Sequence, residues 1–88
     1  MRLTDTQKAR VLASGSETRP GGSLTRKDGE WLVVWHLTYD DLVDPYRKVA
    51  PAQRWRAQVV SSVDADGVWF RPEGQGRTRS NAIAAALA

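Results

Sequence analysis

The chain has 88 residues, which is the size of one small domain with a thin hydrophobic core. It has no cysteine and one histidine, His36, which excludes disulfides, a thiolate nucleophile, Cys-based zinc sites and multi-histidine metal sites within one chain. Neither a run of about 18 apolar residues nor the apolar stretch of a signal peptide is present, so we expect a cytoplasmic protein with no membrane partner.

Charge is distributed unevenly along the chain. Residues 1–27 hold six basic and two acidic side chains, residues 28–46 hold five acidic and no basic ones, and residues 47–88 hold seven basic and three acidic ones. Ten of the 13 basic residues are Arg, whose planar guanidinium suits contacts with phosphate or carboxylate. The pattern indicates a charged partner, and the competing explanation is a GC-rich coding sequence, which favours Arg and Ala.

Residues 1–13 predict a short N-terminal helix. Thr4 and Gln7 have the spacing of a capping box, in which each side chain accepts a hydrogen bond from the other residue's backbone N–H. A helix this short is marginal alone, so it must dock on the rest of the protein. The apolar residues that fall on one side of it are Ala9, Leu12 and Ala13. Residues 14–23, rich in Gly and Ser, then predict a flexible linker.

Asp28-Gly29 is the strongest hairpin signal in the chain, because this pair favours a two-residue turn between strands at residues 23–27 and 30–39. The turn places Arg26 opposite Trp31 and Leu24 opposite Val33. We take the face of the second strand that carries Trp31, Val33, Trp35, Leu37 and Tyr39 as the core face, and the opposite face carries Leu32, Val34 and His36.

A strand that is apolar on both faces must be covered on both. Two helices of roughly eight to ten residues, about 12–15 Å long, are too short to cover both faces of a four-stranded sheet. We therefore expect a homodimer or an obligate partner, with Leu32 and Val34 among the residues that contact it.

Residues 40–51 predict an acidic connection in which Pro45 and Pro51 prevent a long helix. We interpret its carboxylates as a solvated loop that is also a candidate protein contact; a hard-cation site is the alternative, but the spacing matches no calcium loop. These residues are Asp40, Asp41 and Asp44, and we expect ion pairs from them to Arg47, Lys48 or Arg54.

Residues 54–60 predict a third strand by clean alternation, with Trp55, Ala57 and Val59 inward and Arg54, Arg56 and Gln58 outward. A turn at 64–67 leads to a fourth strand at 68–71, and Pro72 ends the pairing.

The remaining residues predict a mobile bend at 74–76 and a helix over 81–87, capped by Thr78 or Ser80. The fold class is α+β: a short N-terminal helix, an antiparallel sheet of three to four strands and a short C-terminal helix. Residues 1–88 form a single domain, in which residues 24–88 supply the sheet and the last helix.

Residues 54–88 resemble the C-terminal half of double-stranded-RNA-binding domains, where a Gly-x-Gly, a hydroxyl residue and basic residues open an Ala-rich helix after a hairpin. They are similarly close to the arm-binding domains of tyrosine recombinases. The resemblance implies that the helix N-terminus and its basic side chains grip phosphates. The matching residues are Gly74, Gly76, Thr78 and Arg79, with Arg77 beside them.

Other candidate contacts come from the sheet. Arg54, Arg56 and Arg71 could extend the basic surface, although charge is also what blunts an exposed sheet. The four Trp residues could stack on bases, but core packing is the better interpretation, and His36 is interpreted as structural. No catalytic constellation, metal site or cofactor motif is recognisable.

We therefore predict a small non-enzymatic binding module with nucleic acid as its most testable partner. The alternative is a small protein of the phage or mobile-element type that binds and modulates a host protein.

Overall fold

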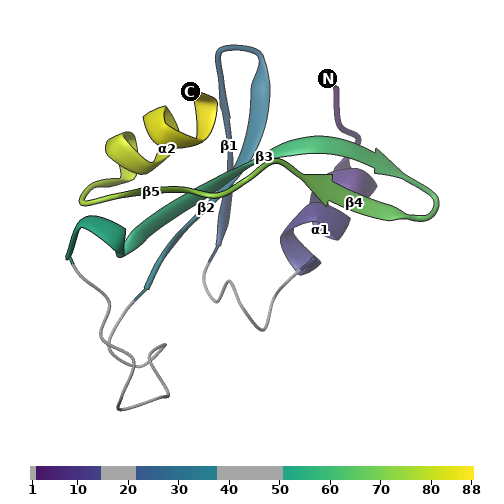
Figure 1. The fold of residues 1–88 in the computed structure, drawn as a ribbon. Coiled ribbons are helices and arrows are strands. Elements are labelled where there is room, and N and C mark those ends of the chain that lie inside the picture. The colour runs from purple at the N-terminus through teal and green to yellow at the C-terminus, as the bar shows by residue number, and fades with distance from the viewer. Residues whose placement is uncertain (1, 15–21, 38–50) are drawn as a thin grey trace.

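The computed structural model describes residues 2–14, 22–37 and 51–88. They form a five-stranded antiparallel sheet with a helix near each end of the chain, so the predicted small α+β fold is confirmed (Figure 1). The elements are α1 (Asp5–Ala13), β1 (Ser23–Lys27), β2 (Glu30–His36), the 3-10 turn η2 (Pro51–Gln53), β3 (Trp55–Asp64), β4 (Gly67–Phe70), β5 (Gly74–Gly76) and α2 (Arg79–Leu87). Neither helix is long and apolar enough to cross a membrane.

Two expectations fall mainly or wholly outside the described residues. One is the linker predicted at residues 14–23. The other is the acidic connection at residues 40–51, with the ion pairs expected from Asp40, Asp41 and Asp44.

Helix α1 begins with the predicted capping box: Thr4 Oγ1 accepts from the Gln7 N–H, and Gln7 Oε1 accepts from the Thr4 N–H. Its docking side was predicted wrongly, because Leu12 is exposed and Val11 is fully buried. The reason is that the docking side is partly polar. Lys8, one turn before Val11, lies with its Nζ 5.0 Å from the centre of the Trp31 ring, and its aliphatic chain covers apolar surface as a hydrophobic side chain would.

The hairpin of β1 and β2 forms around the predicted turn. Asp28 and Gly29 both have positive φ, 53° and 77°, as a two-residue turn of the type that matches strand twist requires. The register is the predicted one, with Arg26 paired with Trp31 and Leu24 with Val33.

Strand β3 is the centre of the sheet. It pairs with β2 along one edge, and with β4 and β5 in succession. Pro72, which has no N–H, lies in the gap between β4 and β5. The pairing resumes at Gly74, so residues 74–76 are a short strand against residues 55–57 of β3 and not the mobile bend we predicted.

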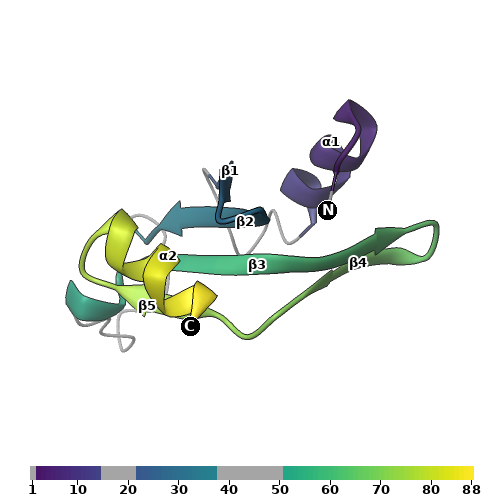
Figure 2. The ribbon, with the colours of Figure 1, turned by 90° about the horizontal axis from the view of Figure 1, so that it is seen from above.

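Two clusters of buried side chains occupy opposite faces of the sheet, because successive residues of β2 point to opposite sides. Figure 2 shows the two helices on different sides of the strands. The α2-side core contains Leu32, Val34, Ala57, Val59, Ala82, Ile83 and Ala86. The α1-side core contains Leu3, Val11, Val33, Trp35 and Val60.

The chain therefore covers both faces of its own sheet, and our premise that it cannot was wrong. Leu32 and Val34 are buried beneath α2 and do not form an apolar surface for a partner. The second face is closed partly by the sheet itself, since Val63, Val68 and Phe70 of the β3–β4 hairpin pack against the α1-side core. A register shift between Val60 and Ser62 accompanies this change of strand course.

Helix α2 packs directly on the backbone of β5. A Cβ atom placed on Gly74 would lie 2.3 Å from the backbone N of Ala86, and one placed on Gly76 would lie 2.5 Å from the backbone N of Ala82. Two glycines on the strand and two alanines one helical turn apart therefore allow a closer approach than larger side chains permit. This contact fixes where α2 begins, and with it the position of the basic residues around its N-terminus.

Candidate nucleic-acid interface

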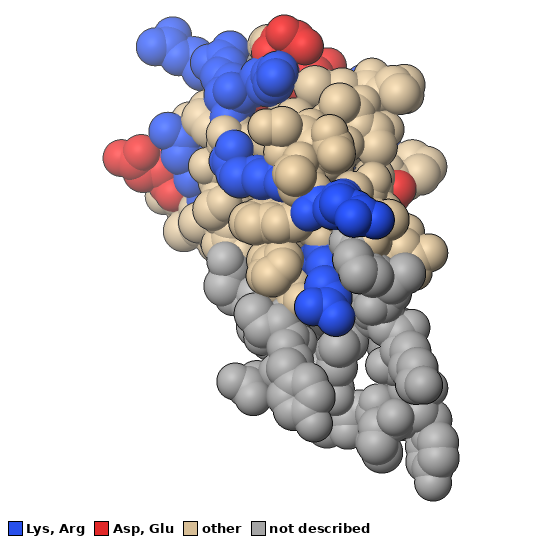
Figure 3. Space-filling model, turned by 90° about the vertical axis from the view of Figure 1, so that its left-hand side faces the viewer, with Lys and Arg blue, Asp and Glu red and all other residues tan. Residues whose placement is uncertain are grey.

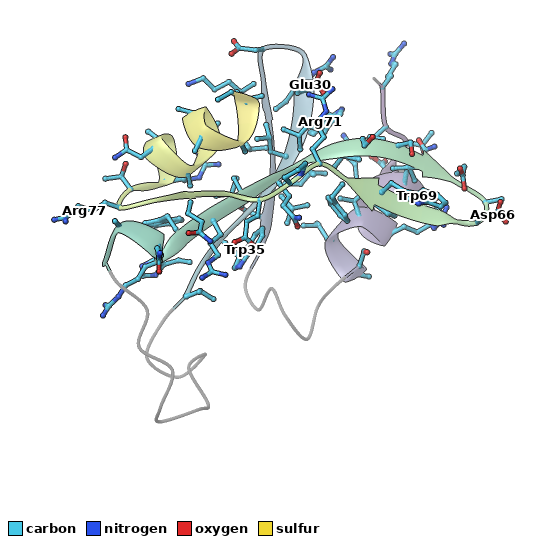
Figure 4. The ribbon with its side chains drawn as sticks, in the orientation of Figure 1. Glu30, Trp35, Asp66, Trp69, Arg71 and Arg77 are labelled. Atoms are coloured by element: carbon cyan, nitrogen blue, oxygen red, sulfur yellow. The ribbon has the colours of Figure 1, made fainter. Side chains whose placement is uncertain are left out.

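Three exposed Arg side chains gather where β3 begins, β5 ends and α2 starts. Trp55 pairs with Gly76, so the residues that flank this pair, Arg54 and Arg77, are neighbours across the two strands. Arg79 is the first residue of α2, two positions further along the chain. We call Arg54, Arg77 and Arg79 the basic cluster. Figure 4 shows Arg77 pointing away from the molecule at this end.

The N-terminus of α2 adds to the positive potential of the basic cluster. Thr78 caps the helix, and its Oγ1 accepts from the Asn81 N–H at 3.2 Å. The first N–H groups of any helix lack partners within the helix, and the helix dipole places a partial positive charge there. Nine residues of helix place this charge beside two guanidinium groups, which favours an anion.

The basic cluster has no carboxylate partner among residues 2–14, 22–37 and 51–88. Figure 3, which faces this end of the molecule, shows Lys and Arg side chains across the surface and acidic side chains towards its margins. The described surface at this end can therefore bind an anion without first breaking an ion pair.

Two of the predicted binding residues are placed differently, each in an ion pair. Arg56 Nη1 lies 3.2 Å from Glu73 Oε1, with side chains only 19% and 26% exposed, and its Nε donates to the Gln53 carbonyl. Arg71 Nη2 lies 3.7 Å from Glu30 Oε1. The sequence did not indicate these two ion pairs, because Glu73 is far along the chain from Arg56 and Glu30 is far from Arg71.

The predicted role of the glycines also changes. The resemblance placed Gly74 and Gly76 among the phosphate-binding residues, but both are buried and turned towards α2. The space that the missing side chains leave is filled by the helix backbone. These residues therefore position the basic cluster and do not contact a ligand from that side.

Three of the four Trp residues pack against the cores and one does not. Trp35 is buried, while Trp31 and Trp55 pack against the two cores. The His36 ring lies 4.6 Å from the Trp55 ring, which supports its structural interpretation. Trp69 is 47% exposed, although we expected it in the core.

Among the described residues, no group of three or more His, Cys, Asp or Glu side chains could hold a metal ion. The arrangement that remains is an exposed set of guanidinium groups at a helix N-terminus, which can hold phosphate or carboxylate.

Comparison of the chain with protein-family models, with curated proteins and with solved structures finds no match.

Proposed function

We propose that this protein is a small non-enzymatic module that binds the phosphate backbone of nucleic acid through Arg54, Arg77 and Arg79. One observation carries the proposal: strand pairing and the α2 contact bring these three exposed guanidinium groups to one helix N-terminus, with no acidic partner in the part of the chain that the structure describes. Arg binds phosphate through charge-assisted, often bidentate hydrogen bonds. The partial resemblance of residues 54–88 to double-stranded-RNA-binding domains supports the same surface.

The test is binding of the full chain to duplex RNA and duplex DNA across a salt series that starts at about 50 mM, where phosphate contacts are strongest. Replacing Arg77 and Arg79 with Ala is expected to weaken binding to every sequence alike and to lower the salt slope by about two. The matched control replaces Arg2 and Arg10 with Ala. It removes the same charge from the N-terminal helix segment and is expected to change the slope less.

Equal losses for the two double variants would mean that net charge and not the basic cluster carries binding. Absence of binding by the unmodified protein at low salt would overturn the proposal. That outcome would favour the alternative, a phage-type protein that captures a host protein.

A further inference from the structure

We propose that Trp69 is a stacking platform for one unpaired base, so that the nucleic acid bound by this module includes a single-stranded segment along the edge formed by β4 and β5. This inference rests on the proposed function and extends it from phosphate contact to the class of nucleic acid. It is carried by the exposure of Trp69, the position of Arg71 beside it and the shared course of β4 and β5.

Trp69 points to the side of the sheet that α2 covers, but beyond the helix. Its neighbours Val68 and Phe70 pack in the α1-side core, so Trp69 lies on the opposite face of the strand. Its partner across the hairpin is Ser62, which is too small to cover an indole. Figures 1 and 2 show the β3–β4 hairpin extending as an arm past the helices.

One side of the indole rests on the strand itself. A Cβ atom placed on Gly67 would lie 3.6 Å from Trp69 Cη2, so the ring lies back over the glycine. Together with an exposure of 47%, this leaves a flat aromatic surface supported from below. Stacking of a base on such a surface is tolerant of sequence, because every base has a π-face.

The surroundings fit a nucleotide better than a protein partner. Trp69 and Leu12 are the exposed large hydrophobic residues among those described, and Leu12 belongs to α1, which covers the other face. With no second exposed large hydrophobic residue on this face among those described, a single ring is too small for the hydrophobic centre of a protein interface. Arg71, two residues on and 53% exposed, shares its face and reaches Glu30 at 3.7 Å. An exposed pair this long contributes only about 0–1 kcal/mol, so Arg71 can turn to a phosphate.

The charges along this edge indicate the course that the bound strand takes over the surface, from Trp69 towards Arg77. Asp66 lies at the arm tip, beyond Trp69 (Figure 4), and its N–H donates to Asp64 Oδ1 in the same turn. These two carboxylates repel phosphate. Arg71 and then Arg77 lie the other way. Glu73 lies between them, but Arg56 neutralises it in an ion pair of 3.2 Å. Arg77 is eight residues from Trp69. At about 3.3 Å per residue this is a span of about 26 Å, within reach of a short single strand.

The experiment compares oligothymidylate and oligouridylate of about 12 nucleotides with a blunt duplex of equal length, by fluorescence anisotropy of the labelled strand. Trp69→Ala is expected to lower single-strand affinity about tenfold and to leave duplex affinity nearly unchanged. Trp69→Phe should retain most of the affinity because Phe also stacks. Leu12→Ala, the other exposed apolar residue, is the matched control and should bind like the unmodified protein.

Tryptophan emission gives a second readout that does not depend on affinity. Single-strand binding should change the emission of the unmodified protein, and Trp69→Phe should abolish that change. Unaltered single-strand affinity in Trp69→Ala, or an emission change that survives in Trp69→Phe, would overturn the inference while leaving phosphate binding by Arg77 and Arg79 intact. No binding by the unmodified protein to any of the probes would overturn both, and the open indole would then favour a protein partner.

Discussion

At the residue scale, the fold depends on glycines, which have no side chain. Gly74 and Gly76 let β5 touch the backbone of α2, whereas Gly67 has room for a methyl group. All three glycines lie at a strand end, but their surroundings differ. Packing therefore requires glycine at positions 74 and 76, whereas it does not require glycine at position 67.

Gly74→Ala is expected to destabilise the protein by about 3 kcal/mol or more, because the new methyl group would lie 2.3 Å from backbone and the helix must move. Gly67→Ala is the matched control: its methyl group would meet Trp69 at an ordinary 3.6 Å, and we expect a change below about 1 kcal/mol. Urea unfolding followed by circular dichroism measures both. A loss in Gly74→Ala no larger than that in Gly67→Ala would contradict the close contact.

The limits of sequence reasoning are also visible at single residues. Alternation indicated correctly which face Trp55 occupies, because residues 55–59 pair with β2 in an unbroken register. It could not place Trp69, since a register shift in β3 and the course of the arm decide what covers that ring. Val11 was missed because Lys8 shares its docking side, and a search for apolar side chains does not count a lysine that lies over Trp31.

At the scale of elements, short-range signals were the most reliable. The capping box of α1 and the Asp28-Gly29 turn depend on residues a few positions apart, so the sequence was sufficient for both. Strand β5 was not predicted, because its three residues gain their partners from β3, about 20 positions away along the chain. The candidate site shows the same difference. The sequence placed Arg77 and Arg79 together because they are two positions apart, whereas Arg54 becomes their neighbour only through the pairing of β3 with β5.

Helix α2 has no acidic residue in its first turn, so Thr78 is its main N-terminal stabiliser. Thr78→Ala should cost about 1 kcal/mol, because the Asn81 N–H loses its acceptor. Thr78→Ser keeps a hydroxyl and should cost less than half of that. Thermal unfolding of the two variants gives the comparison, and equal losses would mean that the methyl group of Thr78, not the cap, is what matters.

At the scale of the whole molecule, the two cores share one thin sheet. Helix α2 covers one face, α1 and the β3–β4 hairpin cover the other, and the apolar side chains of β2 are buried from both sides. The apolar face that suggested a homodimer or an obligate partner is thus an internal surface. Its residues should behave in mutagenesis as core and not as an interface.

Leu32→Ala is expected to destabilise the protein by about 2–5 kcal/mol through the cavity it leaves beneath α2. Leu12→Ala, at an exposed position, should change stability by less than about 0.5 kcal/mol. If Leu32 instead contributed to an association surface, the unfolding midpoint of the unmodified protein would rise with its concentration. Calorimetric scans at two concentrations separate the two roles.

The contact between β5 and α2 also constrains how this protein can diverge. Two glycines and two alanines must stay small together, because the glycines face the backbone of α2, which cannot shorten in compensation, and the alanines are buried in the core. Other core positions can exchange volume with their neighbours and drift. Descendants of a common ancestor should therefore retain the spacing Gly-x-Gly, five residues, Ala, three residues, Ala long after the rest of the chain has lost detectable similarity. Kinship within this lineage would then be recognised by a pattern of four small residues and not by overall identity.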